Sequence, residues 1–400
     1  MSDVWQALRA EFLLSAEFIH LNSMLVASHP RPVREALEAY ARRLDENPTL
    51  CLLREQERNQ QRTLDAAASY MGVRAADIAL TDSTAMGLGL LYHGLPLDAS
   101  SDILTTVHEH RYTHEALRLV SRRCGASLRK ISLYEHGGSA NAEEMVSAVE
   151  RAIQPNTRLI AMTWVHSGTG VKTPVREIAE AVARANVGRV EADRAILAVD
   201  GVHGFGVEDV MIPELGCDFF IAGCHKWIFG PRGTGVIWGP AWSRTRPSIP
   251  PVEPEWIDSW MHKESAPVVT ASAMSPGGMR AHEYRWALAE AFDLHLRLGK
   301  ANVERRIREL NSQCKEGLAA MSHVRLETPI APELSSGIVC FEVDGMEPAA
   351  VVRSLIESQI IASVTPYLPT YVRFSPSLIN TPEEIETVLE AVGSLRWAWV

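Results

Sequence analysis

The sequence predicts an α/β protein with a large domain built on a mostly parallel, mixed sheet and a smaller C-terminal α/β domain. In the middle of the 400-residue chain, short apolar runs alternate with amphipathic stretches, which is the pattern of β-α-β units. A stretch rich in proline and tryptophan at residues 238–267 interrupts this alternation, which then resumes. We therefore expect a large domain at residues 21–265 and a small domain at residues 1–20 and 266–400, joined by a linking helix.

The expected elements follow in chain order. Charged residues interrupt the apolar stretch at residues 1–14, which indicates an amphipathic helix of the small domain and not a secretory signal. Five strands are expected at 102–107, 127–131, 159–165, 195–199 and 219–222, and four helices at 84–93, 114–124, 142–152 and 174–186. An irregular crossing between the domains at 238–267 and one long helix at 281–320 come next. The small domain then alternates strand and helix at 336–343, 348–359, 371–375 and 382–392.

Charge and composition argue against several classes of partner. The formal net charge is −10 and the 39 basic residues are scattered, so neither nucleic acid nor an anionic membrane is expected as the main partner. No run approaches the roughly 18 unbroken apolar residues of a membrane-spanning helix. The six cysteines form no CxxC pair and no Cys/His metal spacing, so we expect no metal site and a reducing, cytoplasmic location.

The strongest chemical signal is Lys226, which closely follows an apolar strand and precedes the glycine-rich turn at 230–235. Burial and nearby positive charge at such a strand end lower the pKa of an amine and make it nucleophilic near neutral pH, as Schiff-base chemistry requires. A lysine after a strand is more often an ordinary surface residue. The neighbouring motifs favour the catalytic interpretation here.

Asp200 ends another apolar strand, three residues before His203. A carboxylate at the C-terminal end of a parallel strand faces the crevice in which α/β sheets bind ligands. There it can keep a pyridinium nitrogen protonated, as an electron-sink cofactor requires. Standing alone, Asp200 would equally fit a helix cap or a turn.

Three further segments carry candidate binding residues. Residues 81–87 open a helix whose free N–H groups can bind phosphate, although Ser and Thr are also ordinary helix caps. His108 and His110 follow a strand, where an aromatic ring can stack on a flat cofactor or serve the fold alone. Arg373 can bind a carboxylate through two parallel hydrogen bonds, or lie on the surface.

Taken in order, these motifs make the chain resemble the class V aminotransferase family of fold-type I pyridoxal 5'-phosphate (PLP) enzymes, from about Leu21 to Thr381. The family includes cysteine desulfurases, isopenicillin N epimerase-like proteins and C–S lyases. The resemblance implies the fold-type I architecture and PLP as the cofactor. It is carried by Ser83-Thr84-Ala85, Glu109-His110, Val199-Asp200-Gly-Val-His203, Cys224-His225-Lys226, Gly230-Pro-Arg-Gly-Thr-Gly235 and Arg373-Phe-Ser followed by Asn380-Thr.

The resemblance also implies a role for each matched residue. Three would be catalytic: Lys226 as the Schiff-base lysine and proton shuttle, His110 stacked on the ring, and Asp200 at the pyridine nitrogen. Arg373 would bind the substrate carboxylate, with Asn22 as a second substrate-binding residue. The remaining cofactor contacts would come from Thr84, the backbone of Ala85 and His225 at the phosphate, and from His203 and Ser167 at the ring oxygen.

The sequence departs from the family pattern at three places. Ala85 stands where many members carry a second threonine, and Gly223 stands where serine is common, so two hydroxyl contacts to the phosphate are missing. Residues 275–279 replace a stretch that reaches the partner subunit's phosphate in relatives. The family is dimeric, and in a homodimer Gly277 and Gly278 would let a partner's backbone approach the cofactor; the pair equally fits a simple turn.

Fold and cofactor do not fix the reaction, which depends on the substrate side of the site. Desulfurases carry a mobile cysteine shortly before the carboxylate-binding arginine, and no cysteine lies between Cys340 and Arg373. We therefore expect no persulfide-forming desulfurase. The expected reaction is β-elimination from an S-substituted cysteine, a C–S lyase reaction in a biosynthetic pathway.

Several alternatives stay open. Epimerisation, transamination and decarboxylating or oxidative deamination of a modified amino acid share the first steps. A catalytically inactive binding subunit is the alternative of another class, against which the intact Lys226, Asp200 and Arg373 argue. The tryptophans at 238–261 suggest a wall for a bulky S-conjugate, or domain packing. The exact substrate, the acid–base histidine and any assembly beyond a dimer are not fixed by the sequence.

Overall fold

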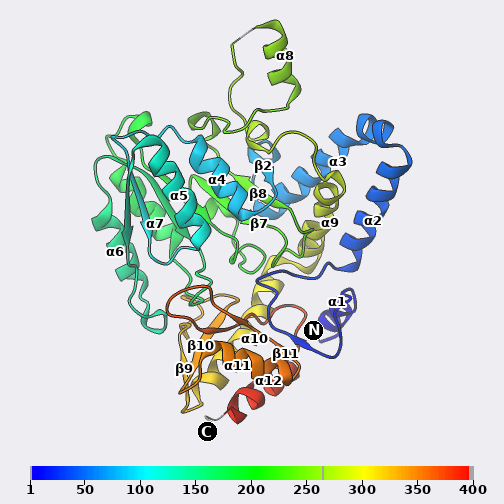
Figure 1. The fold of residues 1–400 in the computed structure, drawn as a ribbon, viewed down its shortest axis with the longest axis vertical. Coiled ribbons are helices and arrows are strands. Elements are labelled where there is room, and N and C mark those ends of the chain that lie inside the picture. Colours follow the sequence, from blue (N-terminus) through cyan, green and yellow to red (C-terminus); the bar gives the residue numbers. More distant parts are fainter. Residues whose placement is uncertain (1, 264, 396–400) are drawn as a thin grey trace.

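The structure is a computed structural model, and it describes residues 2–263 and 265–395. Two sheets organise the molecule. Figure 1 shows the large sheet with its helices in the upper half and the small sheet with its helices below it. The predicted α/β class, with a mostly parallel mixed sheet and a smaller C-terminal α/β unit, is confirmed.

Within the described residues the large sheet has seven strands. Strand β8 runs antiparallel to both its neighbours, whereas β7, β6, β5, β3 and β4 run parallel to one another. The predicted strands of this sheet agree with the structure to within two residues at each end. Across the sheet the order is β2 (Ile78–Thr81), β8 (Gly235–Trp238), β7 (Phe219–Gly223), β6 (Ile196–Asp200), β5 (Thr157–Thr163), β3 (Asp102–Thr106) and β4 (Ser127–Ile131).

Two hydrophobic cores cover the two faces of this sheet. Successive strand residues point to opposite faces, so in β6 Ile196 and Ala198 join one core, and Leu197 and Val199 join the other. Helices α4 (Thr84–Gly94) and α5 (Arg111–Cys124) cover the first face. The second face is covered by α3 (Pro48–Met71), α6 (Ala142–Ala152), α7 (Val175–Ala185) and α9 (His282–Leu298), and α2 (Arg31–Glu46) packs against α3 and α9.

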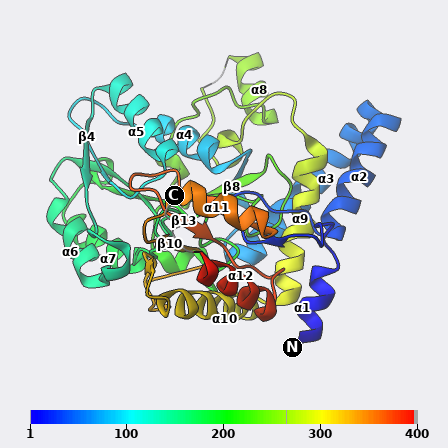
Figure 2. The same ribbon diagram turned by 60° about the horizontal axis from the view of Figure 1, so that its bottom comes forward.

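The small sheet is antiparallel, and three helices pack on it; Figure 2 shows them in front of the sheet. Strand β1 (Ile19–His20) pairs in parallel with β11 (Ile360–Ile361) beside it. The strands are β12 (Ser363–Val364), β13 (Val372–Phe374), β10 (Val339–Val343) and β9 (Val324–Leu326), and the helices are α10 (Lys300–Ala319), α11 (Pro348–Glu357) and α12 (Pro382–Ser394).

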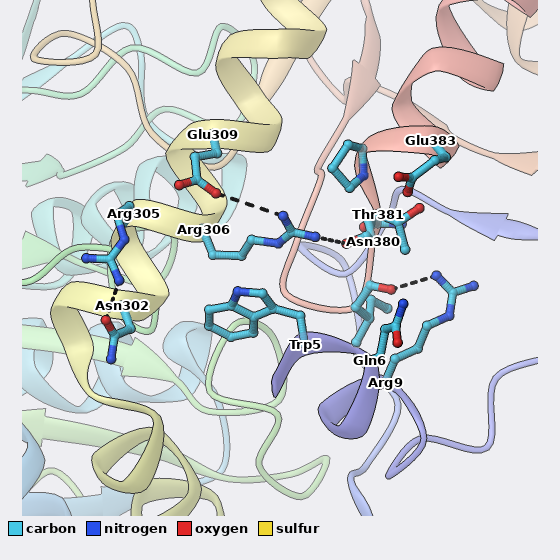
Figure 3. Close-up of a pocket in the computed structure, with 12 residues that line it drawn as sticks. Trp5, Gln6, Arg9, Asn302, Arg305, Arg306, Glu309, Asn380, Thr381 and Glu383 are labelled. Carbon is cyan, nitrogen blue, oxygen red and sulfur yellow. Dashed lines mark hydrogen bonds and ion pairs between the residues drawn. The ribbon is translucent and has the colours of Figure 1, made fainter. Parts of the chain in front are cut away.

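The N-terminal helix α1 (Ser2–Arg9) contacts the small domain (Figure 3). Arg9 forms an ion pair with Glu384 of α12 at 2.5 Å. Arg306 of α10 donates a hydrogen bond to Asn380 O at 2.9 Å, and its guanidinium lies 5.9 Å from the ring of Trp5. These contacts connect the two ends of the chain.

The single helix expected at 281–320 is in fact two helices, α9 and α10. Gly299 between them has a φ of +79°, in the left-handed region that favours glycine. The turn at Gly299 redirects the chain from the large domain to the small one. Because residues such as Met274 lie in a core of the large domain and α9 packs against α2 and α3, the domains divide near Gly299, later than the residue 265 that we expected.

The segment expected to cross irregularly between the domains belongs instead to the large domain. Trp238 ends β8, and Trp242 packs edge-on against Phe219 with ring centroids 5.2 Å apart. Helix α8 (Pro254–His262) follows and protrudes at the end of the molecule opposite the small sheet (Figure 1). The buried Trp238 and Trp242 fix the start of this segment to the large domain, whereas its later part is exposed and carries α8.

In the part of the chain described, no helix is long and apolar enough to cross a membrane.

Short 3-10 helices occur in addition to the α-helices. The 3-10 helices lie at Ala75–Asp77, Gly137–Ser139, Glu191–Asp193, Ile212–Leu215, Trp242–Arg244 and Ser272–Met274.

Candidate active site

The C-terminal ends of β5, β6 and β7 lie at one edge of the large sheet, and several predicted site residues gather there. Asp200 is the last residue of β6, Lys226 lies in the turn after β7, and Ser167 lies in the turn after β5. The register pairs Thr163 of β5 with Asp200, and Asp200 with Ile221 of β7. Parallel strands thus present their following loops side by side, as α/β ligand sites require.

The surroundings of Lys226 lower the pKa of its amine. Trp227 donates its indole N–H to His203 Nδ1 at 3.4 Å. Because an indole N–H can only donate, His203 Nδ1 accepts and its proton lies on Nε2. Nε2 is 3.3 Å from Lys226 Nζ, so its N–H can donate to the amine once Lys226 has lost its proton. Burial lowers the pKa of Lys226 to about 8; the charge of Arg373 acts in the same direction and that of Asp200 against it.

Asp200 is a buried carboxyl with room for another partner. The backbone N–H of Val202 donates to Asp200 Oδ1 at 3.2 Å. Burial raises the pKa of Asp200 to about 6, while that hydrogen bond and the charge of Lys226 act against the rise. Asp200 is therefore largely ionised at pH 7 and suited to pairing with a protonated ring nitrogen.

The start of α4 and the end of β7 form an anion cradle. Gly223 donates its N–H to Thr84 Oγ1 at 2.8 Å. A Cβ at position 223 would lie 3.0 Å from His225 Cε1 and 3.1 Å from Thr84 Oγ1, so glycine lets these two side chains converge. Among the described residues, the buried His225 Nδ1 has no hydrogen-bond partner. Ala85 lies in the first turn of α4, whose N–H groups have no partner within the helix.

His110 begins α5 and is positioned by the residue before it. Its Nδ1 accepts the N–H of Tyr112 at 3.3 Å, and burial lowers the pKa of His110 to about 4, so the ring is neutral. The buried Glu109 accepts hydrogen bonds from Thr106 Oγ1 at 2.8 Å and from Thr163 N at 3.1 Å. These bonds fix the β3–α5 loop to the adjacent strand, and burial raises the pKa of Glu109 to about 8.

The small domain supplies a positively charged side chain to the site, the guanidinium of Arg373. Arg373, on β13, is buried and donates from Nη1 to Ser167 O at 2.8 Å and from Nε to Ser363 Oγ at 3.1 Å. Its Nη2 makes no hydrogen bond within the described residues and remains available to a carboxylate. Asn22 forms a backbone bridge with Ser375, and its buried Oδ1 also lacks a partner in that part of the chain.

Sequence reasoning missed Tyr367. Its hydroxyl lies 2.7 Å from Ser167 Oγ, and its ring lies edge-on to His110 with centroids 6.1 Å apart. Burial raises the pKa of the phenol, which therefore keeps its proton. Tyr367 lies in the loop before β13, which the sequence marked only as free of cysteine. Nothing in its spacing indicated that the loop brings it to Ser167.

Two groups of predicted residues lie elsewhere. Gly277 packs against Pro250 and Val252, and a Cβ on Gly278 would meet nothing within 4 Å, so the chain does not itself bring this pair to Lys226. The tryptophans at 238–261 form no pocket wall beside Tyr367. Trp238 and Trp242 are buried in the large domain, and Trp260 is 80% exposed on α8.

The residues at this sheet edge fit PLP. The unpartnered His225 Nδ1, Thr84 and the first turn of α4 suit a phosphate group, and the buried Asp200 suits a pyridine nitrogen. The low-pKa amine of Lys226 suits an aldehyde. His110, His203 and Ser167 each lie on a loop at this same edge of the sheet.

Comparisons with known proteins agree with this fit. A model of the class-V aminotransferase family matches residues 21–388. An isopenicillin N epimerase from Streptomyces clavuligerus is 28% identical and covers 98% of both chains. A probable cysteine desulfurase from Xylella fastidiosa (strain Temecula1) is 25% identical and covers 98% of this chain and 95% of its own.

A solved structure shares the fold. The complex of the cystine C–S lyase C-DES with its reaction product cysteine persulfide has a TM-score of 0.84 at 21% identity, and it covers 95% of this chain and 98% of that one. The family match spans most of the chain, and the relatives match it end to end. The chain therefore belongs to the class-V aminotransferase family and is a PLP-dependent enzyme.

Proposed function

We propose that the enzyme is a C–S lyase that acts by β-elimination on an S-substituted cysteine. The observation that carries the proposal is a cavity of about 460 Å³, lined by Tyr367 and Gly168, immediately beside the Ser167 carbonyl that Arg373 binds. A substrate whose carboxylate lies on Arg373 has space there for a large substituent on sulfur. The hydroxyl of Tyr367, a residue that lines this space, lies 2.7 Å from Ser167 Oγ.

The cysteines favour elimination over persulfide formation. No cysteine lies between Cys340 and Arg373. Cys340 itself is buried in β10, and burial raises the pKa of its thiol to about 12. A thiol in that state is a poor nucleophile. The sulfur of the substrate therefore leaves as a thiol.

Each residue of the site has a separate role in the proposed elimination. Bound PLP supplies the electron sink that makes the substrate Cα–H acidic. Arg373 holds the α-carboxylate, and the Lys226 amine takes the Cα proton. The Cβ–S bond breaks, its electron pair leaves with sulfur, and the Tyr367 O–H supplies the proton that turns the thiolate into a thiol. Water returns a proton to Tyr367, and hydrolysis of the remaining fragment gives pyruvate and ammonia.

Epimerisation is the second candidate. Its support is the full-length match to a protein named isopenicillin N epimerase. In that reaction Tyr367, on the substrate side, would return a proton to Cα in place of protonating sulfur. Transamination and oxidative deamination have no comparable support among the residues of the site.

We further propose a cytoplasmic homodimer that works in a biosynthetic pathway. Free cysteines, most of them buried, suit a reducing compartment. The open space around Gly278 suits a second subunit.

The test is a product assay on purified PLP-loaded enzyme with cysteine S-conjugates and free amino acids. We expect pyruvate, ammonia and thiol from the conjugates, and no sulfide from cysteine. Loss of chirality without pyruvate would replace the proposal by the epimerase. The Lys226→Ala protein should produce neither result.

A further inference from the structure

We propose that Arg111 is a second carboxylate-binding residue of the site, and that the cavity beside Tyr367 selects an S-substituent that ends in an acidic group. Arg373 would hold the α-carboxylate of such a substrate, and Arg111 would hold the distal carboxylate. This inference deepens the proposed function and rests on it for the nature of the substituent. The same contact would serve another reaction on an amino acid bound at Arg373.

Arg111 lies beside the predicted catalytic residues and also lines the cavity. It is the first residue of α5, directly after His110, and it borders the cavity together with Tyr367. The charges of Arg111 and Arg373 both lower the pKa of His110, so the two guanidiniums lie near the same ring. The cavity of about 460 Å³ has room for the chain that joins two carboxylates. One substrate can therefore contact both arginines.

The guanidinium of Arg111 has no counter-ion among the described residues. It donates from Nη2 to Tyr112 OH at 3.1 Å, and its central carbon lies 4.9 Å from the centre of the Tyr112 ring. Neither contact supplies a negative charge, and no carboxylate in that part of the chain forms an ion pair with Arg111. Its other N–H groups can bind a carboxylate through two parallel hydrogen bonds.

The other ionisable side chains that line the cavity contribute little negative charge. Burial raises the pKa of Glu109 to about 8, so this carboxyl is mostly protonated at pH 7. Burial lowers the pKa of His108 to about 4, and it also lowers the pKa of His114 and His166. The remaining carboxylate among the described lining residues, Glu135, is exposed, and water and salt screen its charge. An acidic occupant therefore meets little repulsion on its way to Arg111.

The experiment uses the PLP-loaded Lys226→Ala protein, in which binding is measured without turnover from the absorbance of the cofactor. The probes are three acids, S-carboxymethyl-, S-(2-carboxyethyl)- and S-(3-carboxypropyl)-cysteine, each paired with its carboxamide of nearly the same size. We expect at least one acid to bind about fivefold more tightly than its amide, the contribution of one partly exposed ion pair. High salt should reduce this preference, because salt screens such a pair.

Arg111→Gln in the same background should abolish the preference for the acid and leave the affinity for the amides unchanged, because the two probes of a pair differ mainly in charge. Glu135→Gln should increase the preference, since it removes a negative charge from the cavity. Arg122→Gln, on the same helix but outside the cavity, is the matched control and should keep the preference. Equal affinities within every pair, tighter binding of the amides, or a preference that survives Arg111→Gln would overturn the inference.

The two proposals fail separately. If the wild-type enzyme releases no pyruvate from the acids but they still bind more tightly than the amides through Arg111, the C–S lyase assignment is wrong and the role of Arg111 stands. If pyruvate is released from acids and amides without any preference, only the role of Arg111 is wrong.

Discussion

Lys226 gains its reactivity from burial and from two neighbours, Arg373 and His203. Burial and Arg373 lower the pKa of the amine, and the acceptor role of His203 Nδ1 orients an N–H toward it. Asp200 opposes the shift. A larger fraction of this amine is therefore unprotonated near neutral pH than of an exposed lysine.

This balance predicts the pH dependence of cofactor loading. A lysine attacks an aldehyde only as the neutral amine, so the rate at which apoenzyme binds PLP should rise up to about pH 8 and then level off. Asp200→Asn removes the charge that raises the pKa of Lys226, so the pH at which the rate of PLP binding levels off should fall. Stopped-flow absorbance measures the rate, and Asp65→Asn on α3 is the control. A profile that still rises at pH 9 would contradict the assignment.

Tyr367 gives a second prediction for single residues. If its O–H protonates the departing sulfur, Tyr367→Phe should slow elimination of alkyl thiols by about a hundredfold and that of nitrophenyl thiols little, because acidic thiols need no proton to leave. Steady-state rates over a series of leaving groups measure the difference. Tyr284→Phe should behave as wild type. Equal slowing across the series would assign Tyr367 to binding alone.

The residues that sequence reasoning identified share one property. Lys226, Asp200 and Thr84 each follow an apolar strand, so their position at the sheet edge follows from the strand pattern. Tyr367 reaches the site through loop geometry and a contact with Ser167 of the other domain, which no local pattern encodes. Sequence reasoning therefore found the cofactor side of the site and Arg373, and missed Tyr367.

The end of strand β7 is the element on which we expect the phosphate cradle to depend. Gly223 lies where a Cβ would press on Thr84 and His225, both of which face the phosphate cradle. We expect Gly223→Ala to weaken PLP binding about tenfold by separating these groups, a cost of about 1.4 kcal/mol. Titration of apoenzyme measures the dissociation constant. Gly89→Ala on α4, where a Cβ meets nothing within 4 Å, should leave it unchanged.

Elements with strong periodicity were the predictable ones. Helix α6 was expected at 142–152 and has those bounds, because Asn141 caps it and its apolar residues recur at helical spacing. The break at Gly299 was missed, because one glycine inside a helical pattern is often tolerated. Its left-handed conformation becomes visible only in the tertiary structure, where the chain changes domains there.

At the scale of the whole molecule, a buried carboxylate joins the domains. Glu208 of the large domain accepts from Lys172 at 2.8 Å and from Ser336 Oγ of the small domain at 2.7 Å, and Arg308 of α10 lies 3.4 Å away. Because removal of one member leaves buried charge unpaired, Glu208→Gln should cost about 3 kcal/mol of unfolding free energy.

Calorimetry measures this cost and also shows how the domains unfold. We expect the melting temperature to fall and the transition to broaden or split, because the two domains lose the carboxylate of Glu208 that joins them. Glu150→Gln removes an exposed pair with Arg184 and should change little, since such pairs contribute about 0–1 kcal/mol. A single sharp transition at the wild-type temperature would show that Glu208 contributes nothing to the stability of the contact between the domains.

Arg373 and Tyr367 belong to the small domain, whereas the phosphate cradle, Asp200 and Lys226 belong to the large one. The loop that carries Tyr367 can therefore change while the phosphate cradle keeps its own contacts. We expect insertions or exchanges in the loop before β13 to alter which amino acid is accepted. Lineages that diverged in substrate are thus expected to differ most between residues 365 and 371, and a graft of that loop alone should carry a donor's preference into this scaffold.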